Sequence, residues 1–136
     1  MVFIHDFYTY IEEKRKEYRT FQPVFCTALG AHVHFNTEGF RHLLFKTHRQ
    51  PRPEAEQKHK LSLLSAVLPI LAKSHTVYEY REEGVRRKVA YFALVGYYEA
   101  RHEKVRVIVR KNGTGAFFFC SVMRHHVKKP KSSLQE

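Results

Sequence analysis

The sequence is poor in several residue types that mark whole classes of protein. It has 136 residues, no tryptophan, only two cysteines, and no apolar run near the roughly 20 residues that span a bilayer. Cys26 and Cys120 make neither a disulfide framework nor a four-ligand zinc site, which favours a reducing intracellular compartment. Asp6 and a charged stretch stand where a signal peptide needs an apolar core, so we expect a cytoplasmic protein that does not associate with a membrane.

Acidic residues are scarce beside basic ones. The chain has 24 Lys and Arg against 13 Asp and Glu, a formal net charge of +11, which predicts binding to a polyanion, either nucleic acid or an anionic membrane surface. No Walker loop, GxGxxG, HExxH or paired CxxC occurs, so we expect no cofactor. His32 and His34 would share a strand face but lack a third ligand at suitable spacing, so we expect no metal site.

The hydrophobic content of 43% is enough for the chain to form a packed core. Apolar residues recur at helical spacing up to about residue 74, except in one short alternating stretch. The predicted elements are a helix over 4–21 ended by Pro23, a connector over 22–30, a strand over 31–35, a helix over 38–49 capped by Asn36 or Thr37 and stopped by PRPE at 51–54, and a buried helix over 59–74, kinked or restarted near Pro69.

After residue 74 the pattern changes to segments rich in β-branched and aromatic residues. The predicted strands are 76–82, 86–99, 104–111 and 115–123, separated at Glu83-Gly84, Arg101-His102 and Asn112-Gly113. Breaks this short favour an antiparallel meander. The fold class is therefore α+β, with N-terminal helices packed on one face of a four-stranded antiparallel sheet and the other face available. We divide the chain into a helix and connector (1–30), an α+β domain (31–124) and a basic flexible tail (125–136).

The helix predicted over 38–49 carries two candidate histidines. At 100° per residue, one side holds Phe40, Leu43, Leu44 and Thr47, and the opposite side, toward water, holds His42, Lys46 and Arg49. Arg41 and His48 fall on the flank, which makes His48 the better candidate of the two for a functional imidazole. The alternative is that both histidines belong to a solvated basic face.

The strands supply candidate phosphate ligands. Arg106 and Arg110 share one strand face with Ile108, opposite three valines, and two arginines so placed can bind a phosphate backbone or stabilise a phosphoryl group in transfer. Alternatively, they protect an edge strand from aggregation. In the last strand, alternation groups Ser121 with Phe117, Phe119 and Met123, so that its hydroxyl can donate to phosphate. Tyr91 is either a base-stacking ring or an ordinary sheet aromatic.

The runs VHFNTEGFRHLLFKTH and YFALVGYYEARHEKVRVIVRKNGTGAFFFCSVM resemble the barnase–EndoU–colicin–RelE-like (BECR) ribonucleases, in particular their phage-associated branch. The resemblance covers roughly residues 31–124. It implies RNA cleavage without a metal, by attack of the ribose 2′-hydroxyl, in a toxin or phage-conflict setting. By motif position, His48 or His42 would transfer the proton, Arg106 or Arg110 would stabilise the phosphate, and Ser121 and Tyr91 would orient it. No carboxylate stands at an obvious general-base position, which leaves the base unassigned.

A toxin of this type would also need an acidic antitoxin or immunity protein. The expected RNA contacts are Arg41, Lys46, Arg49, Lys111, Arg124, Lys128 and Lys129. Two alternatives remain: a non-catalytic RNA- or DNA-binding module that uses the same basic sheet face, and a regulatory or phage structural protein that docks on an acidic partner.

Overall fold

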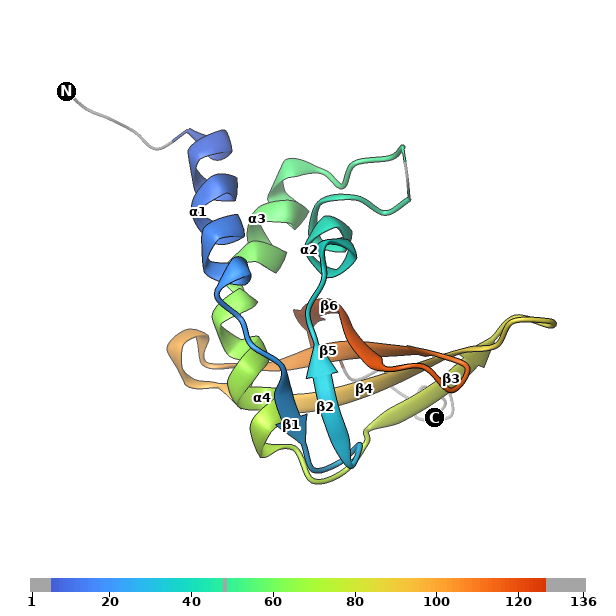
Figure 1. Ribbon diagram of the computed structural model, residues 1–136. Helices are drawn as coiled ribbons and strands as arrows, with labels where there is room; N and C mark the ends of the chain where they lie inside the picture. Colours follow the sequence, from blue (N-terminus) through green and yellow to red (C-terminus); the bar gives the residue numbers. More distant parts are fainter. Residues whose placement is uncertain (1–5, 48, 127–136) are drawn as a thin grey trace, which may run out of the picture.

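The protein is an α+β domain built on a six-stranded mixed sheet (Figure 1). The computed structural model describes residues 6–47 and 49–126. In these ranges the strands are β1 (Val24–Cys26), β2 (Ala31–His34), β3 (Glu79–Glu83), β4 (Val89–Tyr98), β5 (Glu103–Asn112) and β6 (Phe117–Arg124). The helices are α1 (Phe7–Arg19), α2 (Thr37–Leu44), α3 (Glu54–Ser62) and α4 (Val67–Lys73), with short 3₁₀ turns η1 (Leu64–Ala66) and η2 (Glu99–Arg101).

The predicted α+β class is confirmed, but the sheet is larger than the four antiparallel strands that the sequence predicts. The strand order is β1-β2-β6-β5-β4-β3. The strands β3 to β6 form the expected antiparallel meander, and β2 adds to β6 in parallel, with β1 antiparallel beyond it. The additional strands have only three and four residues, too few for a periodicity to identify them as members of the sheet.

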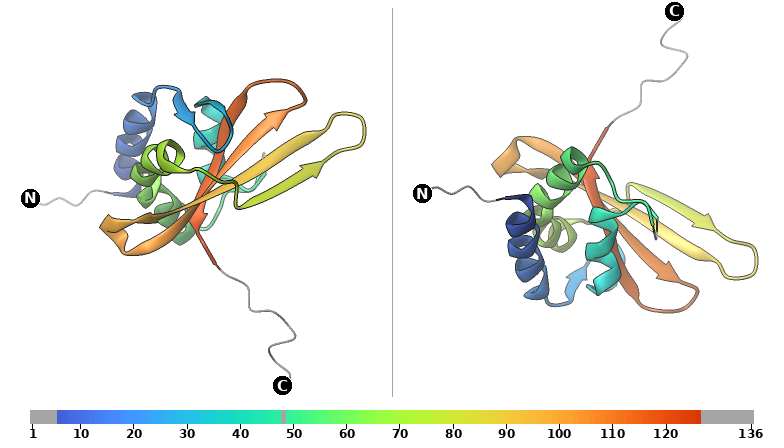
Figure 2. Two further views of the ribbon diagram at one scale, coloured as in Figure 1. Left: turned by 90° about the horizontal axis from the view of Figure 1, so that it is seen from below. Right: turned by 90° about the horizontal axis from the view of Figure 1, so that it is seen from above.

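Turn residues end the strands where the sequence predicts. Gly84, His102 and Gly113 have φ values of +98°, +50° and +55°, in the left-handed region. Glycine reaches this region without a steric penalty, which explains two of the three breaks. The β3–β4 hairpin that turns at Gly84 extends away from the helices in every view (Figures 1 and 2).

Two of the helices differ from their predicted limits. α2 begins after the cap Asn36, whose side chain accepts from the Gly39 N–H, but it ends at Leu44 rather than near residue 49. The chain then becomes extended at Phe45, which forms a bridge with Pro51. The helical break predicted near Pro69 lies earlier, between α3 and α4, because Pro69 sits in the first turn of α4, where its missing N–H has no helical partner to lose.

One core joins the N-terminal segment to the rest. The helices bury Tyr18, Phe40, Leu43, Leu61 and Leu71 against the sheet residues Val33, Leu94, Val105, Val107, Val109, Phe119 and Val122. Tyr18 of α1 touches Phe40 and Phe119, and its hydroxyl donates to the Asn36 carbonyl, so α1 is fixed to the start of α2. Burial raises the pKa of this phenol. No helix among the described residues has both the length and the apolar character to cross a membrane.

Candidate functional site

The edge of β6 is covered by two helices instead of a strand. β2 pairs only with Phe117 and Phe118, so the following carbonyl groups of β6 lack a strand partner on that side. The His42 Nδ1 of α2 lies 3.1 Å from the Cys120 carbonyl oxygen, and the Lys60 Nζ of α3 lies 3.1 Å from that of Val122. Since buried carbonyls need donors, these two side chains complete the edge.

A β-bulge at Cys120 changes which side chains of β6 share a face. The β5 partners step from Ile108↔Ser121 to Val109↔Phe119, which leaves Cys120 without a partner. The predicted grouping of Ser121 with Phe119 is therefore wrong. Ser121 is only 7% exposed, and its hydroxyl accepts from the Lys60 Nζ at 3.3 Å, so it is not available on the exposed sheet face.

Lys60 is the most buried charged side chain among the described residues, at 6% exposure. Burial, with a smaller contribution from the nearby Arg52 guanidinium, lowers its pKa to about 8, and Glu56 opposes the shift. Arg52 pairs with Glu56 at 2.7 Å and donates to the His42 backbone carbonyl at 2.9 Å. This network holds α2 and α3 together beside the bulge.

The sequence places His42 toward water, but the structure places it half-buried at the mouth of a small pocket. Because a carbonyl only accepts, the Nδ1 contact with Cys120 puts the proton of the neutral ring on Nδ1 and leaves Nε2 as the basic nitrogen. Nε2 lies 3.9 Å from the Glu38 carboxylate, one turn earlier in α2. The Glu38 carboxylate therefore faces the nitrogen that would take up a proton in an acid–base step.

Arg110 enters the same pocket from β5. The pocket holds about 80 Å³, and since a water in the liquid occupies roughly 30 Å³, it fits a small anion rather than a nucleobase. Arg110 has no ion pair within the described part of the chain. Burial raises the pKa of the neighbouring Cys120 thiol, against the smaller opposing effect of Arg110, so this thiol is protonated near neutral pH. The lining residues are Asn36, Glu38, His42, Arg110, Asn112, Phe118, Phe119 and Cys120.

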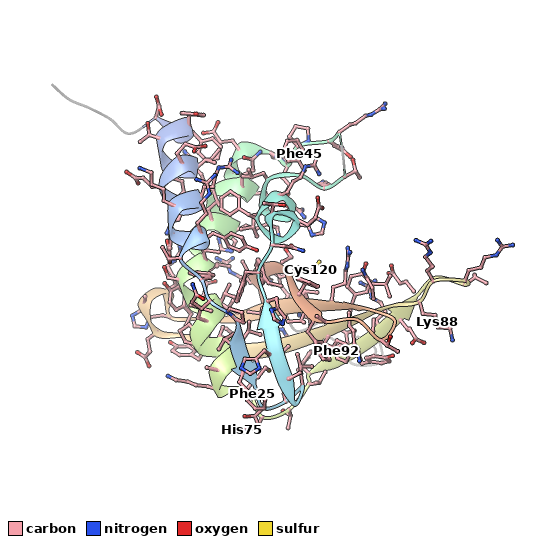
Figure 3. The ribbon with its side chains drawn as sticks, in the orientation of Figure 1. Phe25, Phe45, His75, Lys88, Phe92 and Cys120 are labelled. Carbon is pink, nitrogen blue, oxygen red and sulfur yellow. The ribbon has the colours of Figure 1, made fainter. Side chains whose placement is uncertain are left out.

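A row of cationic and aromatic side chains crosses the sheet beside this pocket. The row consists of Arg81, Tyr91, Arg110, Phe118 and His34, and each is the cross-strand neighbour of the next. The Arg81 guanidinium lies 4.8 Å from the Tyr91 ring centroid, and the rings of Phe118 and His34 are 5.7 Å apart. At about 4.8 Å between strands, the row is about 19 Å long. Figure 3 shows Cys120 beside α2 on this side of the sheet and Phe92 on the other.

Arg106 lies on the same sheet face as Arg110, as predicted, but its charge is already paired. Its guanidinium contacts the Glu79 carboxylate at 2.8 Å and lies 5.2 Å from the Tyr78 ring. These residues line a groove of about 710 Å³ that also includes Tyr91 and Met123. The groove is large enough for a nucleotide-sized ligand.

The other predicted contacts are dispersed. His48, Lys128 and Lys129 lie outside the described residues. Lys46 and Arg49 are exposed in the loop after α2, and Arg41 stacks on Phe45. Lys111 lies over Phe117 on the opposite sheet face from Arg110, and Arg124 pairs with Glu103 at 2.6 Å.

Sequence reasoning missed Lys60, Arg52, Glu38 and Arg81. A lysine inside an apolar helical stretch is a signal that could have identified Lys60, since a buried ammonium group needs acceptors. Among the described residues, no group of three or more His, Cys, Asp or Glu side chains could hold a metal ion. No protein-family model, curated protein or solved structure matches this chain.

Proposed function

We propose that this protein is an endoribonuclease that binds single-stranded RNA along the row Arg81–Tyr91–Arg110–Phe118 and cleaves it at the His42 pocket. The observation that carries the proposal is the convergence of an imidazole and an unpaired guanidinium on one anion-sized pocket. Two members of the row, Arg110 and Phe118, line that pocket. Rings on which bases stack beside a cation that meets phosphate are typical of single-strand binding surfaces. Arg110 is that cation here, because Arg81 pairs with Glu83 at 2.6 Å.

The chemistry fits attack by the ribose 2′-hydroxyl on the adjacent phosphate. His42 Nε2 takes the 2′-hydroxyl proton, the 2′-oxygen forms a bond to phosphorus, and the bond from phosphorus to the 5′-oxygen breaks. The leaving 5′-oxygen takes a proton from solvent at the mouth of the pocket, which gives a cyclic phosphate and a 5′-hydroxyl. Arg110 stabilises the negative charge that builds on the phosphate oxygens, and Glu38 stabilises the imidazolium.

The resemblance to BECR ribonucleases supports the same activity but with a different set of residues. Of the two histidines that the resemblance implies, we choose His42 as the base because it lines the pocket, and we choose Arg110 over the paired Arg106. Ser121 has a structural part, since its hydroxyl bonds to Lys60.

A second candidate function is RNA binding without cleavage. It is favoured by the dispersal of the predicted catalytic set: Arg106 is neutralised by Glu79, and Ser121 is buried. Both candidates use the same sheet face, so binding alone does not separate them.

The substitution His42→Asn separates the two functions. An asparagine amide can still donate toward the Cys120 carbonyl but has no basic nitrogen at the Nε2 position. His75→Asn, at an exposed histidine far from Cys120 (Figure 3), is the matched control. With a labelled single-stranded RNA in EDTA, we expect cleavage by wild type and His75→Asn, and binding without cleavage by His42→Asn. If the wild-type protein binds this RNA and leaves it intact, the non-catalytic function is correct.

A further inference from the structure

The β3–β4 hairpin ends in an exposed basic tip that the proposed site does not use. The tip, defined here as Gly84 to Lys88, contains Arg86, Arg87 and Lys88 beside Val85, which is 93% exposed. Figure 3 shows Lys88 at the far end of the hairpin, beyond the helices. A projecting cationic end on a neutral or acidic ribbon needs an explanation, because it contributes little to the core.

Glu82 and Glu83 lie immediately before the tip and are both paired, and the tip keeps a positive charge. Glu83 pairs with Arg81 at 2.6 Å, and Glu82 lies 3.9 Å from the Lys88 Nζ. Arg86 and Arg87 have no ion pair within the described residues. Their guanidinium groups are therefore available to an external polyanion.

The backbone of the tip is constrained. A side chain at Gly84, where φ is +98°, would place its Cβ 2.2 Å from the Arg87 carbonyl oxygen. The Lys88 carbonyl accepts from the Gly113 N–H of the β5–β6 turn at 3.1 Å, which ties the end of the tip to the neighbouring turn. A constrained tip loses less conformational entropy on binding than a free loop.

The tip lies near the outer end of the proposed RNA-binding row. Arg81 and Tyr91, the first two members of the row, are each two residues from the end of their strand at Glu83 and Val89. At about 3.4 Å per residue, the tip, which begins one residue further on, lies roughly 10 Å from the row. An RNA strand that follows the row away from His42 crosses the edge strand β3 at Arg81, and the tip lies beside that exit point, along the strand direction.

We infer that the tip binds the phosphates of a duplex stem that adjoins the single strand held on the sheet. This inference rests on the proposed function and refines its substrate class to RNA in which a single strand meets a helix. Arg86 and Arg87 contact phosphates across the stem, and Val85 lies against the last base pair. Such contacts read backbone position rather than sequence.

The test compares two RNA probes with the full chain. One is a single strand, and the other carries the same strand as an overhang on a stem, with binding followed by fluorescence anisotropy at several salt concentrations. We expect wild type to bind the overhang probe more tightly. The double variant Arg86→Ala/Arg87→Ala should lose that advantage and keep its affinity for the single strand. Its slope of log K against log salt for the overhang probe should fall by about 1.8, because each duplex phosphate contact contributes about 0.9.

The matched control is Lys16→Ala/Arg19→Ala, which removes the same charge from exposed positions of α1, on the other side of the molecule from the hairpin (Figure 2). It should leave both affinities nearly unchanged. Equal losses for the tip variant and the control, or a tip variant with the wild-type preference, would overturn the inference. So would poly-glutamate binding to the tip as tightly as the stem probe, which would assign the tip to an acidic protein. Failure of wild type to bind the single strand would instead refute the proposed function.

Discussion

Replacing Lys60 by methionine tests whether a buried ammonium group is bound to β6 next to the bulge. Lys60 is 6% exposed, and its pKa in the folded protein is about 8, against an ordinary value of 10.5. Between these two pH values the unfolded chain binds more protons at this position than the folded protein does. The free energy of unfolding must therefore rise with pH across this window. At about 1.4 kcal/mol per pH unit, the rise attributable to Lys60 is about 3 kcal/mol.

Below pH 8 two effects of Lys60→Met oppose each other. Methionine removes the cost of burying a charge, but it leaves the Val122 carbonyl without its donor, which costs about 1–3 kcal/mol. The pH dependence is unambiguous. Subtracting the variant from the wild type also cancels the contributions of all other groups.

The assay is urea unfolding of both proteins at pH 7.5, 8.5, 9.5 and 10.5. We expect the wild-type stability, measured relative to Lys60→Met, to rise by about 3 kcal/mol from pH 7.5 to pH 10.5. If the difference in free energy of unfolding between the two proteins stays constant over this range, Lys60 is not a buried ammonium group. Its role as the donor to the β6 edge would then be refuted as well.

Three further predictions concern the row and its support. Arg110→Ala should reduce the salt dependence of single-strand binding by about 0.7 in the slope of log K against log salt, while Arg106→Ala, already paired with Glu79, should change affinity less than about twofold; equal effects would contradict the assignment. Tyr91→Ala should weaken RNA binding about 5- to 150-fold and Tyr91→Phe hardly at all, as measured by anisotropy, since stacking needs the ring and not the hydroxyl; loss in both variants would argue against stacking. Gly39→Ala should lower the free energy of unfolding in urea by about 1–2 kcal/mol, despite a gain in helix propensity of about 1 kcal/mol, because its Cβ would lie 2.7 Å from the Phe119 carbonyl oxygen; a stabilised variant would show that α2 is free to move from β6.

The local features of the fold were predictable because they depend on residues near in sequence. Alternation alone assigns Val105, Val107 and Val109 to the core and Arg106 and Arg110 to the other face, as the burial of β5 confirms. The helix cap at Asn36 was equally predictable, since a side-chain oxygen there satisfies a free N–H of the first turn.

The features that create the candidate site depend on contacts between distant segments. The helical sequence pattern continues beyond Leu44, but α2 ends there because the bridge from Phe45 to Pro51 competes with the helix. His42 looks solvent-facing on a helical projection, yet its partner, Cys120, is 78 residues away. The bulge at Cys120 has no marker in the local sequence, so strict alternation misassigned Ser121.

The most direct test of the central proposal is the chemistry of the RNA ends. A single-stranded RNA and its 2′-O-methylated counterpart are incubated with wild type and His42→Asn in EDTA, and the products are identified by mass spectrometry. We expect wild type to produce cyclic phosphate and 5′-hydroxyl ends from the unmodified RNA only. His42→Asn should be about 100-fold slower or more, as for loss of a general base. Cleavage of the 2′-O-methylated strand, equal rates for the two proteins, or intact RNA with wild type would contradict the proposal.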